Sequence, residues 1–340
     1  MHISCFTSFS CAYLSRARVL AQTLRAAHPD WWLTALLVDR LPGGIPNLAG
    51  FDAVVPAEAL GIDGFPAWMF RHDLVEGCTA MKGRMLQRLL QDDVDAVIYL
   101  DPDIAVFHGL HAALAALRDA SVVLTPHHTD PNDMSAAIRD NERTTLRFGV
   151  FNLGFLAVRK DAAGLDFARW WADRLHEACY DDPDAGLFTD QRYCDLVPGM
   201  FDGVHILRDP GSNVASWNLS RRHLAFDPSG RLLANGVPLG FYHFSKIDGA
   251  GDAMIERYAG PNICAAELLA CTVAAWHGNT SRPLPTDPGT SDTSPTTRRS
   301  RAPPACSDAP TPSWQTSLPI PSLPAPAASR HRWNMTIPIC

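Results

Sequence analysis

The sequence predicts an α/β protein with a mixed, mostly parallel central sheet. The strongest indication is the apolar run from Ala96 to Leu100, because a strand covered on both faces of a sheet is apolar throughout rather than alternating. A second indication is the order of strand, helix and strand over residues 2–38, with short connections. That order predicts two parallel strands joined by a right-handed crossover.

Composition divides the 340 residues into three parts. Residues 1–260 are expected to form one domain, which is large but ordinary for an α/β fold. Residues 261–278 contain an apolar helix candidate. Residues 279–340 carry 13 of the 27 prolines, and Pro-rich, unpatterned sequence cannot bury enough apolar surface to offset chain entropy. We therefore expect this C-terminal tail to be disordered.

The first half of the domain alternates between strand and helix patterns. We expect strands over residues 2–9, 31–38, 53–56, 96–100 and 121–125, an extended segment over 104–107, and helices over 12–27 and 109–117. Residues 65–90 are helical by pattern, and we expect two helices with a break near Gly77.

The second half opens with a long polar segment, residues 126–149, without a clear pattern of its own. Loops of this length are usually lids or binding loops. Beyond it we expect strands over 151–158, 204–208 and 241–246, a helix over 161–179, and a hairpin formed by 223–226 and 231–233.

Charge and cysteine content exclude several classes of protein. The net charge is −7, and the tail's six arginines and three aspartates make the domain more acidic still, which argues against a nucleic-acid partner. The nine cysteines form no Cys-x-x-Cys pair, as expected of free thiols in a reducing cytoplasm. The N-terminus lacks a cationic leader, and no apolar run reaches about 18 residues. We expect a cytoplasmic protein and leave peripheral contact with the inner membrane face open.

Two carboxylates, Asp101 and Asp103, follow the apolar strand directly. Open α/β sheets bind ligands in the crevice at the carboxyl ends of their strands. Hard oxygen ligands at such a place suit Mg²⁺ or Mn²⁺, which in turn suits a diphosphate. The alternative is an ordinary turn at the strand end, because Asp-Pro is also common turn chemistry. No Gly-x-Gly-x-x-Gly or Walker A pattern occurs, which disfavours dinucleotide and P-loop enzymes.

Seven motifs occur in an order that is more specific than any one of them. They are Phe6-Thr7-Ser8 with Tyr13, Cys78-Thr79-Ala80-Met81-Lys82, Tyr99-Leu100-Asp101-Pro102-Asp103, Phe151-Asn152-Leu153-Gly154-Phe155, Thr189-Asp190-Gln191, Asn213-Val214-Ala215-Ser216-Trp217-Asn218-Leu219 and Phe241-Tyr242-His243-Phe244-Ser245. Over about residues 1–250 this order resembles the GT-A glycosyltransferases, near family 8 and related bacterial cell-surface polysaccharide enzymes. The resemblance implies a Rossmann-like nucleotide-diphospho-sugar transferase fold.

The resemblance also implies a metal site and a donor. Asp101, Asp103 and His243 would hold Mn²⁺ or Mg²⁺, and the donor would be a nucleotide sugar, with UDP the family expectation. Taken alone, His243 is more simply a packed strand histidine. A metal bridging two phosphates stabilises the charge of the departing diphosphate as a Lewis acid.

The remaining motif residues have roles implied by the same resemblance. The nucleotide base and ribose would contact Thr7, Ser8 and Tyr13, and the phosphates or the donor sugar would contact Lys82 and Lys246. The sugar pocket would include Asn152 and Gly154. The anomeric carbon would lie beside Asp190 and Gln191. Relatives usually have glycine where this chain has Lys246. Asp190 is alternatively a helix N-cap, because Thr-Asp is good cap chemistry.

The expected reaction is transfer of the sugar to a saccharide or lipid-linked acceptor. Family 8 resemblance implies retention at the anomeric carbon with assistance from Gln191 or Asp190, while inversion would need one base on the acceptor hydroxyl, for which Asp190 is available. Two alternatives stay open: a haloacid-dehalogenase-like phosphatase, which also places Asp-x-Asp after an apolar strand, and a catalytically dead nucleotide-sugar-binding protein.

Overall fold

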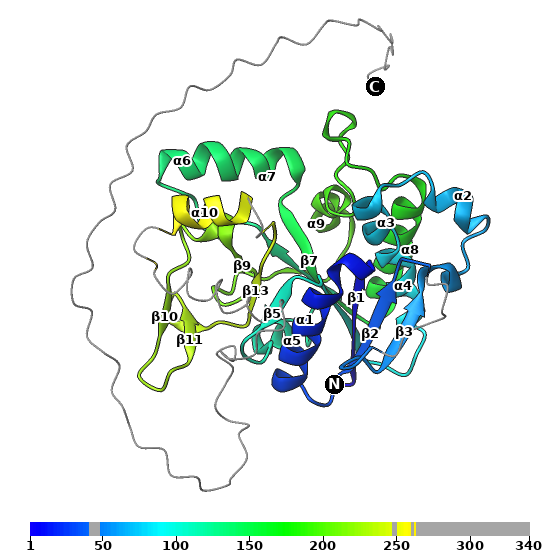
Figure 1. The fold of residues 1–340 in the computed structure, drawn as a ribbon, viewed down its shortest axis with the longest axis horizontal. Coiled ribbons are helices and arrows are strands. Elements are labelled where there is room, and N and C mark those ends of the chain that lie inside the picture. The colour runs from blue at the N-terminus through cyan, green and yellow to red at the C-terminus, as the bar shows by residue number, and fades with distance from the viewer. Residues whose placement is uncertain (41–47, 247–249, 260–261, 263–340) are drawn as a thin grey trace, which may run out of the picture. The chain divides into compact units, whose positions relative to one another are not determined.

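The centre of the molecule is a seven-stranded sheet in the order β3-β2-β1-β4-β7-β6-β8 (Figure 1). A computed structural model describes residues 1–40, 48–246, 250–259 and 262. The strands are β1 (Ile3–Phe9), β2 (Trp32–Leu37), β3 (Ala53–Pro56), β4 (Ala96–Leu100), β6 (Val122–Pro126), β7 (Phe151–Arg159) and β8 (Val204–Ile206). Only β7 runs against its neighbours within this sheet, while the other pairs are parallel. The expected α/β class and mixed, mostly parallel sheet are confirmed.

Helices cover both faces of this sheet. One face carries α1 (Leu14–Ala27) and α5 (His111–Ala116), and the other carries α3 (Leu74–Ala80), α4 (Lys82–Leu89) and α8 (Ala162–Glu177) (Figure 1). Strand β4 contributes to both layers, since Val97 and Tyr99 pack on the α4–α8 side while Ile98 and Leu100 pack on the α1–α5 side. Burial on both sides explains the unbroken apolar run that predicted this strand.

A second sheet brings residues 241–243 beside the segment that follows β4. It consists of β5 (Ile104–Val106), β13 (Phe241–His243) and β9 (Val214–Ala215), with β13 antiparallel to β5 and parallel to β9. The register pairs His243 with Ile104, and the backbone N–H of Phe244 donates to the carbonyl oxygen of Asp103 at 2.9 Å. Two segments about 140 residues apart in sequence therefore meet beside Asp103.

The C-terminal described elements form a small group of their own. The predicted hairpin is confirmed as β10 (Leu224–Phe226) and β11 (Leu232–Ala234), which β12 (Val237–Pro238) extends. Helix α10 (Ala250–Tyr258) follows β13. No helix among residues 1–40, 48–246 and 250–259 is long and apolar enough to cross a membrane. The expected helix over 261–278 and the tail over 279–340 lie outside the described residues, apart from the single residue 262.

The prediction of two helices broken near Gly77 is wrong. The segment forms α2 (Phe65–Met69), α3 and α4, with Gly77 inside α3. The break comes earlier because Asp73 caps α3: its carboxylate accepts from the Glu76 backbone, and the Glu76 carboxylate accepts from the Asp73 backbone. A Cβ on Gly77 would lie 2.8 Å from the Met69 sulfur, so glycine serves close packing against α2 rather than a break.

The prediction that residues 126–149 lack regular structure is also wrong. They contain α6 (Ser135–Ala137), a π-helical turn over 138–142 and α7 (Arg143–Phe148). Contacts with distant segments stabilise these turns, since the Tyr258 hydroxyl donates to the Asp140 carboxylate at 2.6 Å and Arg257 lies 2.6 Å from the same group. Tertiary contacts of this kind leave no periodic signal in the segment itself.

Candidate active site

A cavity of about 530 Å³ opens where β1 and β4 end side by side. Eleven of the twelve residues predicted for the site line it: Ser8, Tyr13, Lys82, Asp101, Asp103, Asn152, Gly154, Asp190, Gln191, His243 and Lys246. The twelfth, Thr7, is fully buried inside β1 and is not among the lining residues.

Asp101, Asp103 and His243 form the polar centre of the cavity. One ligand atom from each lies within 4.8 Å of the others. The Nε2 atom of His243 lies 3.1 Å from Asp103 Oδ1 and 3.6 Å from Asp101 Oδ2. Two carboxylate oxygens and one imidazole nitrogen are a donor set that suits Mn²⁺, and Mg²⁺ less completely because of the nitrogen.

The orientation of His243 fits this use. Its Nδ1 atom lies 3.0 Å from the Oδ1 atom of Asn152, and a carbonyl oxygen can only accept, so Nδ1 carries the proton. Nε2 then faces the two carboxylates, where a bound ion would take its lone pair in place of a proton, as in a metal-ligating histidine with an outer partner. Burial lowers the pKa of His243, but the carboxylates of Asp103 and Asp101 outweigh it and raise the pKa above its ordinary value.

Gly154 makes room for this arrangement. A Cβ atom at this position would lie 2.5 Å from Cε1 of His243 and 2.9 Å from Oδ1 of Asn152. Any side chain would therefore collide with the bonded pair. The glycine in the middle of β7 is explained by the close approach of His243.

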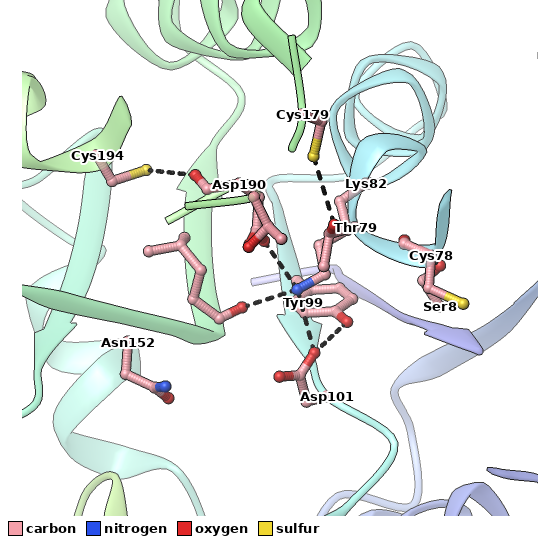
Figure 2. Close-up of polar contacts among 12 residues, drawn as sticks. Ser8, Cys78, Thr79, Lys82, Tyr99, Asp101, Asn152, Cys179, Asp190 and Cys194 are labelled. Atoms are coloured by element: carbon pink, nitrogen blue, oxygen red, sulfur yellow. Dashed lines mark hydrogen bonds and ion pairs between the residues drawn. The ribbon is translucent and has the colours of Figure 1, made fainter. Parts of the chain in front are cut away.

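Lys82 joins Asp101 to Asp190 across the cavity. Its ammonium lies 3.1 Å from Asp101 Oδ1 and 2.8 Å from Asp190 Oδ2, and donates to the Leu153 carbonyl at 3.2 Å (Figure 2). The ammonium also lies 4.2 Å from the centre of the Tyr99 ring. Burial lowers the pKa of Lys82, yet the carboxylates of Asp101 and Asp190 dominate and keep the side chain protonated. The ammonium thereby fixes both carboxylates in place.

Asp190 and Gln191 are both buried and both hydrogen-bonded. Besides Lys82, Asp190 accepts from the Thr189 hydroxyl at 3.2 Å, and burial raises its pKa although Lys82 acts in the opposite direction. The Gln191 amide donates to the Phe148 carbonyl at 2.8 Å. Asp190 is not the N-cap of the next helical turn, since Gln191 occupies that position. Both residues line the cavity, and their predicted catalytic role stays a prediction.

Ser8, Tyr13 and Lys246, which the resemblance assigns to the nucleotide and its phosphates, all line the cavity, and that role stays a prediction. Ser8 donates to the Cys78 carbonyl at 2.7 Å, and Tyr13 is 37% exposed. Lys246 has a φ of +56°, a region that favours glycine. Lys246 therefore adopts a backbone conformation that is uncommon for a residue with a side chain.

Sequence reasoning missed three residues of the cavity: Tyr99, His127 and Trp217 received no role. The Tyr99 hydroxyl donates a short hydrogen bond to Asp101 (Figure 2). Trp217 lies edge-on to His243 with ring centres 5.4 Å apart. His127 lies at the end of β6, the place where sheet topology collects functional side chains, and that position was the available signal.

No family model matches the sequence. Two proteins of Bacillus subtilis strain 168 are similar. YfnF is 29% identical over 197 residues, which are 56% of this chain and 63% of YfnF. YfnD is 30% identical over 174 residues, 50% of this chain and 53% of YfnD. The chain therefore matches less than two thirds of the length of either relative, and both are described as uncharacterized.

Two solved structures share a similar arrangement of elements. The galactosyltransferase LgtC, in complex with donor and acceptor sugar analogues, is 18% identical with a TM-score of 0.46, covering 83% of this chain and 97% of LgtC. Mouse xyloside xylosyltransferase 1 is 16% identical with a TM-score of 0.40, covering 72% of this chain and 98% of its own. Both are sugar transferases. At this level of similarity the function has to be argued from the site itself.

Proposed function

We propose that this chain transfers a sugar from a nucleoside-diphosphate sugar, with uridine as the nucleoside, to a hydroxyl of a saccharide or lipid-linked acceptor. The observation that carries the proposal is the meeting of Asp101, Asp103 and His243 on the wall of a cavity large enough for a nucleotide sugar. The motif order from Phe6 to Ser245 supports it independently.

Asp101, Asp103 and His243 would hold the divalent ion, for which we propose Mn²⁺. When bound, that ion supplies Lewis-acid stabilisation of the diphosphate. Asn152 orients His243 through Nδ1, and Lys82 with Tyr99 orients Asp101. Lys246, at the rim, provides a cation for the phosphates. Neighbouring side chains would therefore orient the ion ligands before the donor binds.

We propose retention at the anomeric carbon, assisted by Gln191 or Asp190. Asp190 is tied to Lys82 at 2.8 Å and is only 4% exposed, which disfavours it as a freely moving base for an inverting reaction. Gln191 donates through its amide nitrogen to Phe148, so its carbonyl oxygen is the atom left to face the sugar.

Apolar side chains at the mouth of the cavity favour an acceptor with an apolar part. Leu74 and Val75 line the cavity at the start of α3 and are 50% and 62% exposed. Apolar surface of this kind commonly marks a binding region. It supports a lipid-linked saccharide as the acceptor, and with it the peripheral contact with the inner membrane face that the sequence leaves open.

Calorimetric binding of UDP and GDP tests the proposal, with Mn²⁺ and with EDTA. We expect UDP to bind in Mn²⁺ and the affinity to fall on the order of a hundredfold in EDTA or in Asp103→Asn, since both remove the charge that holds the diphosphate. Asp166→Asn, a 61%-exposed position on α8, is the matched control and should bind as wild type.

Absence of nucleotide binding by the folded wild type would contradict the proposal. Hydrolysis of a generic phosphate monoester would then favour the phosphatase alternative, in which Asp101 is the nucleophile. Binding of UDP-hexoses without turnover would favour a catalytically dead binding protein.

A further inference from the structure

The cavity holds a second histidine, His127, which belongs neither to the proposed metal ligands nor to the residues assigned to the nucleotide. It directly follows β6, and its ring lies beside Trp217 with centres 5.5 Å apart, while Trp217 lies edge-on to His243. Trp217 therefore separates the two imidazoles. His127 is also hydrogen-bonded to Val150, at the start of β7, which places its ring between Trp217 and the junction of α7 and β7.

The hydrogen bonds of His127 decide its tautomer. Its Nδ1 atom lies 3.1 Å from the carbonyl oxygen of Val150, and because this oxygen can only accept, Nδ1 carries the proton. The backbone N–H of His127 donates to the same oxygen at 2.9 Å, and Asn218 donates to the His127 carbonyl at 3.2 Å. Backbone and ring are thus both fixed.

Nε2 of a neutral His127 is then an acceptor without a proton. Burial lowers the pKa of His127 to about 4, with the neighbouring His128 and His243 acting in the same direction, so the ring is neutral at pH 7. Within the described residues no donor is recorded for Nε2. A fixed, neutral acceptor on the wall of a binding cavity is complementary to a hydroxyl group.

We propose that His127 binds the acceptor, with Nε2 accepting the hydrogen bond of a saccharide hydroxyl. The inference rests on the proposed sugar transfer and assigns the acceptor to the side of the cavity between Trp217 and the α7–β7 junction. His127 then contributes to transfer of the sugar onto a saccharide acceptor. It contributes little to nucleotide binding or to hydrolysis of the donor.

The variants are His127→Phe, which keeps a flat ring without nitrogen, and His127→Gln, whose amide oxygen can replace Nε2 as an acceptor. His205→Phe, an exposed histidine of β8 outside the cavity, is the control. UDP release is followed from the UDP-hexose that the wild type hydrolyses fastest, first in buffer and then with a panel of methyl glycosides. UDP binding in Mn²⁺ is measured on every variant.

We expect His127→Phe to keep UDP affinity and donor hydrolysis within about threefold, while glycoside-dependent release falls by about a hundredfold, with partial recovery in His127→Gln. Parallel loss of binding, hydrolysis and transfer would show a structural role and overturn the proposal. Unchanged transfer, or a wild type that uses none of the methyl glycosides, would overturn it too. A wild type that binds no UDP removes the proposed function itself, which is a separate result.

A chemical probe gives a readout that does not depend on turnover. Diethyl pyrocarbonate acylates unprotonated, accessible imidazole nitrogen, so His127 should be modified at pH 6, as read by mass spectrometry. The methyl glycoside that accepts the sugar should slow this modification in the presence of UDP and Mn²⁺, and leave His205 unaffected. Modification that the glycoside does not slow contradicts the proposal.

Discussion

Single residues in this site act mainly by orienting one another. Asn152 sets the tautomer of His243, Lys82 and Tyr99 hold Asp101, and the Val150 carbonyl sets the tautomer of His127. In each case the partner is a backbone carbonyl or a side chain with a fixed donor or acceptor role. The chemistry of the cavity is therefore determined as much by the outer partners as by the groups that face the ligand.

Gly154→Ala should separate His243 from Asn152. The new Cβ would lie 2.6 Å from Nδ1 of His243, and this strand is packed on both faces, so the imidazole has to move. We expect Mn²⁺ affinity, measured by calorimetry, to fall about 10- to 100-fold. Gly199→Ala is the control, because nothing lies within 4 Å of a Cβ there and its affinity should not change. Unaltered Mn²⁺ binding in Gly154→Ala would show that His243 is not a ligand.

Sequence reasoning was effective for residues whose environment is local and weak for those whose partners are distant. Asp101 and Asp103 follow a strand that is recognisable by itself. His243 was assigned only through resemblance, since its neighbours come from β5 and β7. The place of His127 at the end of β6 was a signal in the sequence, but its tautomer could not be predicted, because it depends on a carbonyl 23 residues away.

At the scale of elements, Asp161 caps the start of α8 and also connects the start of β6 to the end of β7. Asp161 accepts from the Gly164 backbone N–H at 2.9 Å, from the Ser121 hydroxyl at 2.9 Å and from Arg159. Partial burial acts to raise the pKa of Asp161, but these hydrogen bonds outweigh it and lower the pKa below its ordinary value. The helix that packs on α4, and so supports Lys82, thus depends on an ionised carboxylate.

Asp161→Ala should lower the free energy of unfolding by about 1 kcal/mol at pH 7 through loss of this cap. Because the folded-state pKa is lowered, the carboxylate's contribution is complete above about pH 4 and is lost as the pH falls through the folded-state value. The difference between wild type and variant, measured by urea denaturation, should therefore be constant from pH 5 to 8 and shrink below pH 4. A difference that grows on acidification contradicts this account.

The helices expected over residues 65–90 show that the sequence predicts the type of an element better than its boundaries. The helical pattern was sound, but the position of the break was set by the Asp73–Glu76 capping box and by packing of Met69 against Gly77. A glycine indicates a helix break only when its backbone requires one, and here it allows close contact instead.

At the scale of the whole molecule, α10 packs against the segment 132–150, which lies beside the cavity. Tyr258 and Arg257 both reach Asp140, and Asn262 donates to the Arg222 carbonyl at 2.8 Å. Helix α10 is thereby attached to the segment 132–150, whose last residue, Val150, accepts the hydrogen bond of the His127 ring. The sequence of that segment could not reveal its helices, because they depend on residues more than 100 positions away.

Tyr258→Phe should loosen this segment without unfolding the sheet. Loss of the 2.6 Å hydrogen bond to Asp140 is expected to cost about 1 kcal/mol locally. Amide hydrogen exchange in residues 132–150 should accelerate about fivefold, while exchange in β1 and β4 should not change. Tyr180→Phe serves as control, because no hydrogen bond of its hydroxyl occurs within the described residues. Equal acceleration everywhere would mean global destabilisation instead.

The pairing of β13 with β5 also determines how late in synthesis the three proposed ion ligands come together. Asp101 and Asp103 leave the ribosome early, but His243 follows only after about 140 more residues. A nascent chain can therefore form most of the seven-stranded sheet while the proposed ion ligands are still two carboxylates without their imidazole. Binding of the proposed ion by all three ligands is thus postponed until β13 has emerged and paired with β5, so ion binding would report that the second sheet has formed.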